Sequence, residues 1–204
     1  YTILSLIILS YKKGGIMKKR TIFTVLLLSG LISFAGLCGE AGKLEISEVA
    51  WSGTKASWAD EWIEIRNTGE SEINLEGFKL TWGDVKIHFG KEKENTLVLN
   101  NKMIPAGGFY LLERSDDNTV NQIKADLIFK GGLDNNGNTI ELINNEGQTI
   151  DSLNFKEGWP AGTAGQGEIM YASMVKIEGE WVTSEKKSSK KDAEGNFIHG
   201  SPGA

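Results

Sequence analysis

Apolar and polar residues alternate in short segments along most of the chain. Within residues 42–204, no window has apolar residues at the period of an amphipathic helix. Alternation with a period of two predicts strands, because successive side chains of a strand point to opposite faces of a sheet. The predicted strands span residues 43–50, 61–67, 78–83, 85–89, 96–100, 108–114, 139–144 and 149–155. Several short strands with no helices between them predict an all-β fold, either a two-layer sandwich or a barrel.

The alternation within one predicted strand indicates how many of its faces are buried. The segment EWIEIRN, residues 61–67, places Ile63 and Ile65 on one face and Trp62, Glu64 and Arg66 on the other. This pattern predicts a strand with only one face buried in the sandwich.

The segments between the strands are rich in Gly, Asn and Asp, which tolerate positive φ or form Asx turns. The clearest hairpin is IELINNEGQTIDSL. Ile140 and Leu142 share one face of its first strand, and Ile150 on the second strand is expected to pack with them. The segment IPAGG predicts a tight turn in which Pro105 presets φ and Gly107 and Gly108 allow the reversal. A phosphate-binding loop is the alternative there, but such a loop ends in Lys and Ser or Thr and leads into a helix, and IPAGG has neither.

The N-terminal part of the chain has the pattern of an export signal. Lys18, Lys19 and Arg20 form a basic region, and residues 21–37 form the apolar region that follows it. The preceding KKGGIM can be encoded by a purine-rich ribosome-binding site and a start codon, which predicts that translation begins at Met17. Residues 1–16 are then a translated leader, with a genuine apolar N-terminal extension as the alternative.

Three outcomes are open at the end of this signal. Small residues permit cleavage after Ala35 or Ala41, Cys38 permits cleavage and lipidation as in lipoproteins, and an uncleaved apolar run could anchor the chain. Leu37 is large for the position before a lipidated cysteine, so simple secretion is favoured. Each outcome predicts a domain at residues 42–204 that is secreted or associated with the cell envelope. Because Cys38 is the one cysteine of the chain, no internal disulfide can form.

Charge limits the partners of this domain. Residues 42–204 contain 17 Lys or Arg against 26 Asp or Glu, a net charge of −9. Nucleic-acid binding needs a basic patch, so it is not expected. The densest basic run, SEKKSSKKDAEG at residues 184–195, is broken by acids and serines and predicts a solvated loop.

Several motifs follow one another along residues 44–204: ISEVAWSG, ADEWIEIRNTGESEINLEGFKL, IPAGGFYLLER, GLDNNGNTIELINNEGQTIDSL, GWPAG, WVTS and GSPGA. In this order they resemble the lamin tail domain family. The resemblance implies an immunoglobulin-like β-sandwich, and the family also occurs in exported bacterial proteins. The chain has Val175 where the family commonly has an acid after the methionine, which leaves the pairing of that late strand open.

Acidic residues supply one candidate chemistry. Asp60, Glu61 and Glu64 could act as ligands of a hard cation, but calcium takes about six to eight oxygens and the chain has no regular ligand loop. The segment LDNNGN shares letters with a calcium loop but lacks its alternation and its distal Glu, so a turn is expected. We therefore predict no metal and no cofactor, with calcium binding by an acidic loop left open.

The residues that usually carry catalysis are scarce. Residues 42–204 contain two histidines and no cysteine, so neither a Cys–His pair nor a multi-histidine zinc site can form. His88 is expected to be an exposed strand residue beside Lys86, and His199 to lie in the terminal turn. Asp116 and Asp117 are expected to be solvated in a polar loop. We predict no catalytic residue and no enzymatic activity.

The tryptophans carry the functional prediction. Among Trp51, Trp58, Trp62, Trp82, Trp159 and Trp181, the loop residues Trp58 and Trp159 are predicted to be partly exposed and to contact a partner. The alternative is that both close the ends of the sandwich. The sequence thus predicts an exported binding or tethering module whose partner is a protein or carbohydrate at the cell surface, with membrane contact only through the N-terminal segment. The alternatives are an accessory domain of a longer extracellular hydrolase, such as a nuclease or phosphatase, and a structural envelope lipoprotein.

Overall fold

The computed structural model describes residues 6–13, 16–23 and 44–203. The chain divides into two compact units, Tyr1–Gly36 and Leu37–Ala204. Most of the predicted apolar region, both predicted cleavage points and Cys38 lie outside the described residues.

The described part of the first unit is one antiparallel hairpin. Strand β1 (Leu6–Lys13) pairs with β2 (Ile16–Phe23), with Leu6 opposite Phe23 and Lys13 opposite Ile16. The three basic residues of the predicted export signal lie on β2. Among the described residues of the chain, no helix is long and apolar enough to cross a membrane.

The second unit is built from short strands. They are β3 (Leu44–Ala50), β4 (Trp62–Asn67), β5 (Ile73–Asn74), β6 (Lys79–Trp82), β7 (Val85–His88), β8 (Thr96–Leu99), β9 (Met103–Ile104), β10 (Phe109–Arg114), β11 (Leu127–Phe129), β12 (Thr139–Ile143), β13 (Thr149–Asn154), β14 (Met174–Ile177), β15 (Glu180–Thr183), β16 (Lys187–Lys191) and β17 (Phe197–His199). Every predicted strand is present, and its ends agree to within one residue. The strands that the alternation did not predict are β5, β9, β11 and β14–β17, which are short or lie in polar sequence.

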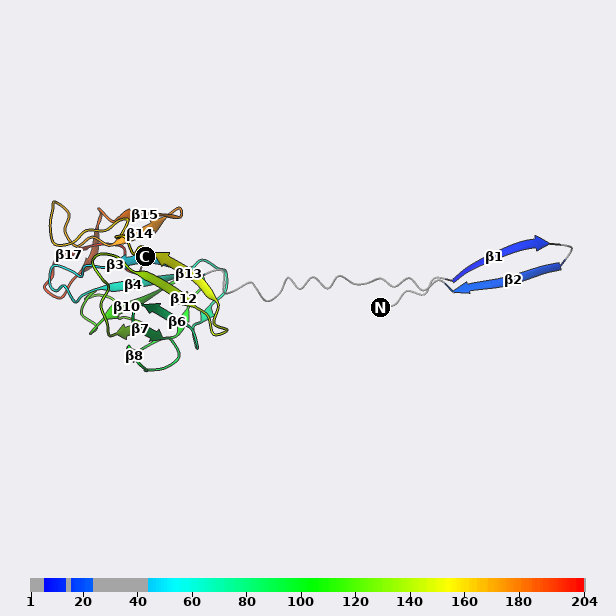
Figure 1. Ribbon diagram of the computed structural model, residues 1–204, viewed down its shortest axis with the longest axis horizontal. Coiled ribbons are helices and arrows are strands. Elements are labelled where there is room, and N and C mark those ends of the chain that lie inside the picture. Colours follow the sequence, from blue (N-terminus) through cyan, green and yellow to red (C-terminus); the bar gives the residue numbers. More distant parts are fainter. Residues whose placement is uncertain (1–5, 14–15, 24–43, 204) are drawn as a thin grey trace. The chain divides into compact units, whose positions relative to one another are not determined.

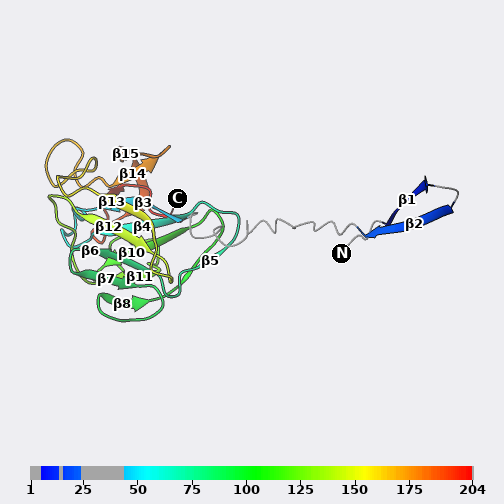
Figure 2. The ribbon, with the colours of Figure 1, turned by 45° about the vertical axis from the view of Figure 1, so that its right-hand side comes forward.

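These strands form an immunoglobulin-like β-sandwich. One sheet has the order β15-β14-β3-β4-β10-β11-β8, and the other has the order β13-β12-β6-β7. All neighbours within these sheets are antiparallel except β10 and β11. Figures 1 and 2 show β14 and β15 at one end of the domain and β8 at the other. The predicted all-β sandwich is confirmed.

The main core lies between the two sheets. Its fully buried side chains include Ile46, Ile63, Ile65, Leu80, Ile87, Phe89, Tyr110, Leu112, Leu127, Phe129, Ile140 and Leu142. Edge-to-face aromatic pairs add directional contacts, because Trp82 meets Phe129 with ring centroids 5.4 Å apart and Phe89 meets Tyr110 at 5.5 Å.

The predicted hairpin is present as β12 and β13. Ile140 and Leu142 are buried as expected, but the residue opposite Ile140 is Leu153, and Ile150 packs at the border of the core. The difference follows from a register irregularity between Leu142 and Ile143. Asp151, opposite Leu142, accepts a hydrogen bond from the backbone N–H of Ile46 at 2.8 Å and so joins the two sheets.

The second face of the large sheet is also covered, so the prediction that β4 has only one buried face was wrong. Trp62 and Glu64 are each 1% exposed. Trp62 belongs to a second apolar cluster with Leu111, Val120 and Ile198. Ile198 lies on β17, far from β4 in sequence, so the alternation within β4 could not reveal that this face is covered.

The basic run at residues 184–195 is not the predicted solvated loop. Five of its residues form β16, which pairs with β17. Asp192, which follows β16, is 1% exposed and accepts hydrogen bonds from the backbone N–H groups of Ala56, Glu194 and Asn196. This buried carboxylate closes the β16–β17 turn and ties it to the loop before β4.

The late strand that contains Val175 has a defined pairing. Strand β14 lies between β3 and β15, with Val175 opposite Glu48 on one side and Val182 on the other.

Candidate binding site

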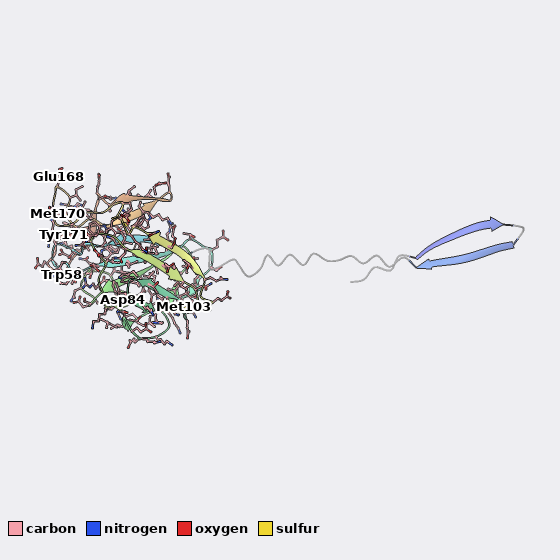
Figure 3. The ribbon with its side chains drawn as sticks, in the orientation of Figure 1. Trp58, Asp84, Met103, Glu168, Met170 and Tyr171 are labelled. Atoms are coloured by element: carbon pink, nitrogen blue, oxygen red, sulfur yellow. The ribbon has the colours of Figure 1, made fainter. Side chains whose placement is uncertain are left out.

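The most exposed large apolar side chain within residues 44–203 is Trp58, with 72% of its surface accessible. It lies in the loop between β3 and β4. This loop is held from within, because the Thr54 hydroxyl donates to Asp60 at 2.7 Å and the Thr54 N–H donates to the carbonyl of Ser57. Gly53 has a φ of +82°, and a side chain there would collide with the Ser57 carbonyl. The loop therefore has a fixed shape and presents Trp58 at the outer edge of the domain (Figure 3).

Arg114, at the end of β10, lies against Trp58. Its guanidinium carbon is 5.0 Å from the centroid of the indole ring, a cation–π contact. The same guanidinium donates to Glu61 Oε1 at 3.1 Å, and Glu61 Oε2 accepts from the Leu133 N–H at 2.8 Å. Glu61 thereby fixes the arginine under the indole and fixes the segment that leads into residues 134–136.

Burial affects Glu61 strongly, since it is only 3% exposed. This burial raises the pKa of Glu61 to about 7, although the Leu133 N–H and Arg114 both favour its charged form. Both carboxylate oxygens are engaged by groups of the protein itself.

The opposite wall is the turn at residues 134–136. Asp134 Oδ1 accepts hydrogen bonds from the Asn136 N–H at 2.8 Å and from the Asn136 amide group at 3.0 Å. The Asp134 carbonyl accepts from the Trp159 indole N–H at 2.8 Å. Trp159 stacks on Trp51, with centroids 6.1 Å apart and planes 8° from parallel. The wall is thus supported by an aromatic pair at its back.

A hollow of about 520 Å³ lies between these parts. We call it the Trp58 hollow, and its lining residues are Ser52, Trp58, Glu61, Arg114, Gly132, Leu133, Asp134, Asn135 and Asn136. This volume is in the range of ligand sites, which span roughly 300–1,000 Å³. The hollow combines one open aromatic surface with amide groups and a paired arginine.

The two predicted contact residues, Trp58 and Trp159, have different positions relative to this hollow. Trp58 is exposed at its rim, whereas Trp159 is half-buried and supports Asp134 from behind. The sequence prediction missed Arg114, Asn135 and Asn136. Arg114 reads as the end of an ordinary strand and the two asparagines as ordinary turn residues, and only the fold brings them next to Trp58.

A second hollow of about 340 Å³ lies over the small sheet and is lined by Thr81, Trp82, Gly83, Gly137, Asn138, Thr139, Glu141 and Lys156. Its tryptophan is only 3% exposed and donates its indole N–H to the Gly132 carbonyl. It therefore offers a ligand little aromatic surface.

The three acids considered as cation ligands serve separate structural roles. Asp60 accepts from Thr54, Glu61 holds Arg114, and Glu64 lies on the covered face of the large sheet. Within residues 6–13, 16–23 and 44–203, no group of three or more His, Cys, Asp or Glu is placed to hold a metal ion.

Glu64 and its neighbour Glu48 bind the C-terminal segment, residues 200–203. Glu48 accepts hydrogen bonds from the Ser173 hydroxyl, from the Ser201 N–H at 2.8 Å and from the Ser201 hydroxyl at 2.6 Å. Glu64 Oε2 accepts from the Gly203 N–H at 2.6 Å. Burial raises the pKa of both carboxyls, that of Glu64 to about 8. The GSPG sequence thus closes the domain over two buried carboxyls.

The histidines lie apart from the Trp58 hollow lining. His88 was expected to be exposed, but it is 9% exposed, because Glu94 lies 3.4 Å from its Nε2 and the Thr96 hydroxyl bonds to its backbone. His199 ends β17, and its Nδ1 lies 3.1 Å from the Glu185 carbonyl. Asp116 is exposed as expected, whereas Asp117 is half-buried and accepts from the Ala125 N–H at 2.7 Å.

Comparison with known proteins agrees with this architecture. No curated protein sequence matched the chain. The family model described as Lamin Tail Domain matches residues 39–157, more than half of the chain. This match covers β3 to β13 and all the residues that line the Trp58 hollow. The chain belongs to the lamin tail domain family.

Proposed function

We propose that the β-sandwich is a non-catalytic binding module that acts outside the cytoplasm, at the surface of a bacterial cell, and that the Trp58 hollow is its ligand site. The observation that carries this proposal is Trp58 itself. A tryptophan side chain is ordinarily buried. Here a rigid loop and Arg114 hold the indole of Trp58 outward, with 72% of its surface exposed. Large apolar side chains that are held in this way are typical anchors of binding sites.

The state of Glu61 supports a role without catalysis. It is the one buried acid that lines the hollow, and a raised pKa is a common feature of catalytic acids. However, both oxygens of Glu61 bind groups of the protein, and the side chain is almost inaccessible. It is positioned to hold Arg114 and Leu133 and not to exchange protons with a ligand.

The charge of the domain supports a partner other than nucleic acid. Residues 42–204 have a net charge of −9, which opposes the approach of a phosphate backbone. The proposed location rests on the export pattern of residues 17–41, through which any contact with the membrane would occur.

Sedimentation with cell walls tests the proposed function. The purified full chain is mixed with walls isolated from the bacterium that encodes it, and the bound fraction is measured against wall concentration. We expect binding, and we expect Trp58→Ala to weaken it by about tenfold or more.

Phe197→Ala is the matched control for this experiment. Phe197 is also exposed, at 50%, and a cation, Lys191 Nζ, lies 5.0 Å from its ring centroid, but it does not line the Trp58 hollow. The control should bind as the unmodified chain does. Equal binding by Trp58→Ala and the unmodified chain would refute the proposed site, and the absence of any binding would refute the proposed function.

The proposed location has its own test. The intact mass of the native protein should be measured in medium, envelope and cytoplasm. We expect a chain that begins at Gly36 or Gly42 outside the cytoplasm, or a lipid-bearing chain that begins at Cys38 in the envelope. A cytoplasmic protein that retains residues 1–16 would contradict both export and the start at Met17.

A further inference from the structure

We infer that the ligand of the Trp58 hollow is a neutral carbohydrate, with a sugar ring stacked on the open face of the indole. This inference rests on the proposed function and specifies the chemical class of its ligand. It follows from the charges of the hollow, from its aromatic surface and from the groups that remain free to form hydrogen bonds.

The charged groups of the hollow disfavour the binding of both cationic and anionic ligands. Arg114 already occupies the cation–π position on Trp58, 5.0 Å from the ring centroid, so a cationic ligand would meet a like charge there. An anionic ligand gains less from Arg114, because the guanidinium already donates a hydrogen bond to Glu61 Oε1 at 3.1 Å, and it would also meet Asp134. An uncharged ligand meets neither obstacle.

The hollow is nevertheless polar, which disfavours a purely apolar ligand. Asn135 is exposed, and its side chain has no hydrogen-bond partner among the described residues. Asn136 uses its amide N–H on Asp134, and its amide oxygen remains available. An amide group offers both a donor and an acceptor, which matches the paired hydroxyl groups of a sugar. A ligand that combines an apolar ring face with a rim of hydroxyls fits this arrangement.

The site is formed before any ligand arrives. Glu61 fixes Arg114 and Leu133, and the Trp159 indole holds the Asp134 carbonyl at 2.8 Å. A site that is already ordered avoids part of the entropy cost of binding. This matters for carbohydrates, since hydroxyl groups exchange hydrogen bonds with water for similar hydrogen bonds with protein, and each exchange contributes little.

The experiment separates a carbohydrate from a protein partner on the same walls. Walls are treated with protease, and binding of the full chain is then measured with and without competing oligosaccharides. The neutral competitors are cellotetraose, maltotetraose and chitotetraose, and the anionic competitor is tetragalacturonate. We expect binding to survive the protease, and we expect a neutral competitor, but not the anionic one, to displace the chain at millimolar concentration.

Variants connect this result to the hollow. Trp58→Ala should weaken binding to protease-treated walls by about tenfold or more, and Asn135→Ala by about threefold. Trp58→Phe should retain part of the affinity, because a smaller aromatic surface remains. Phe197→Ala should leave the affinity unchanged.

Two results would overturn the inference while the proposed function stands. They are loss of binding after protease treatment, which indicates a protein partner, and protease-resistant binding that no neutral competitor displaces. If the chain does not bind untreated walls, the proposed function is refuted, and calorimetric titration with the three neutral oligosaccharides decides the inference separately. No heat of binding up to about 10 mM for any of them would overturn it as well.

Discussion

The buried carboxyl of Glu64 makes a specific prediction about pH. Burial raises its pKa to about 8, the Gly203 N–H partly offsets this rise, and nearby Glu48 and Asp126 add to it. The folded protein therefore binds a proton that the unfolded chain, with the ordinary Glu pKa of 4.5, has released. This stabilisation is complete below the unfolded pKa and is lost as the pH rises through about 8.

The size of the effect follows from the two pKa values. For a carboxyl with a pKa of about 8 when folded and 4.5 when unfolded, lowering the pH from 8 to 6 adds about 2 kcal/mol to the free energy of unfolding. Burial also raises the pKa of Glu48, Glu61 and Glu113, so the unmodified protein should show a still steeper dependence of the same sign. A variant that differs only at Glu64 isolates its share.

The variant is Glu64→Gln, which keeps the shape of the side chain and an oxygen for the Gly203 N–H but cannot titrate. Urea unfolding followed by tryptophan fluorescence should be measured at pH 6 and pH 8. We expect the stability difference between the two pH values to shrink by about 2 kcal/mol in the variant. Glu70→Gln, at an exposed position after β4, should leave the difference unchanged.

An unchanged pH dependence in Glu64→Gln would refute this reasoning. It would mean that Glu64 remains charged in the folded protein and that the Gly203 N–H donates to a carboxylate.

Three further substitutions test the packing of the domain. Asn67→Ala removes a buried amide that donates to three backbone carbonyls and accepts one N–H, and should lower the free energy of unfolding by about 2–4 kcal/mol in urea titrations. Gly137→Ala places a methyl group against the Phe155 carbonyl and should lower the melting temperature strongly. Gly147→Ala, also at positive φ but with open space around it, should lower the free energy of unfolding by only about 1 kcal/mol. Equal effects of the two substitutions would contradict the structure. Gly200→Ala places a methyl group 2.9 Å from a buried carboxylate oxygen and should accelerate hydrogen exchange of the C-terminal amides, while unchanged exchange would show that this contact relaxes freely.

The export of the chain and its lack of catalysis stay predictions, because the described residues do not test them.

The positions of the strands, in contrast, can be compared directly with the structure. Alternation predicted β3, β4, β6–β8, β10, β12 and β13 to within one residue at each end. In β6 and β12 the buried residues alternate with exposed or half-buried ones, because burial of one face imposes a period of two on the sequence.

The turn residues were also predictable, because a backbone with positive φ favours glycine whatever surrounds it. Gly107 has a φ of +66° in the turn after Pro105, as IPAGG suggested. The shorter strands were not predictable in this way. Strand β11 has three residues, all buried, and β16 is composed of Lys and Ser, so neither shows the alternation that identifies a half-buried strand.

The sequence by itself determined that the domain is all-β and where eight of its strands lie, because alternation and turn chemistry are local properties. Only the tertiary structure decided what covers each strand and which loops meet. Part of the second face of β4 is covered by Ile198 and by the segment that ends in Gly203, more than a hundred positions away, so Glu64 becomes a buried acid although its local pattern is that of a surface residue. The Trp58 hollow likewise joins three separate segments, and its amides and arginine gain a common role only when the sheets have packed.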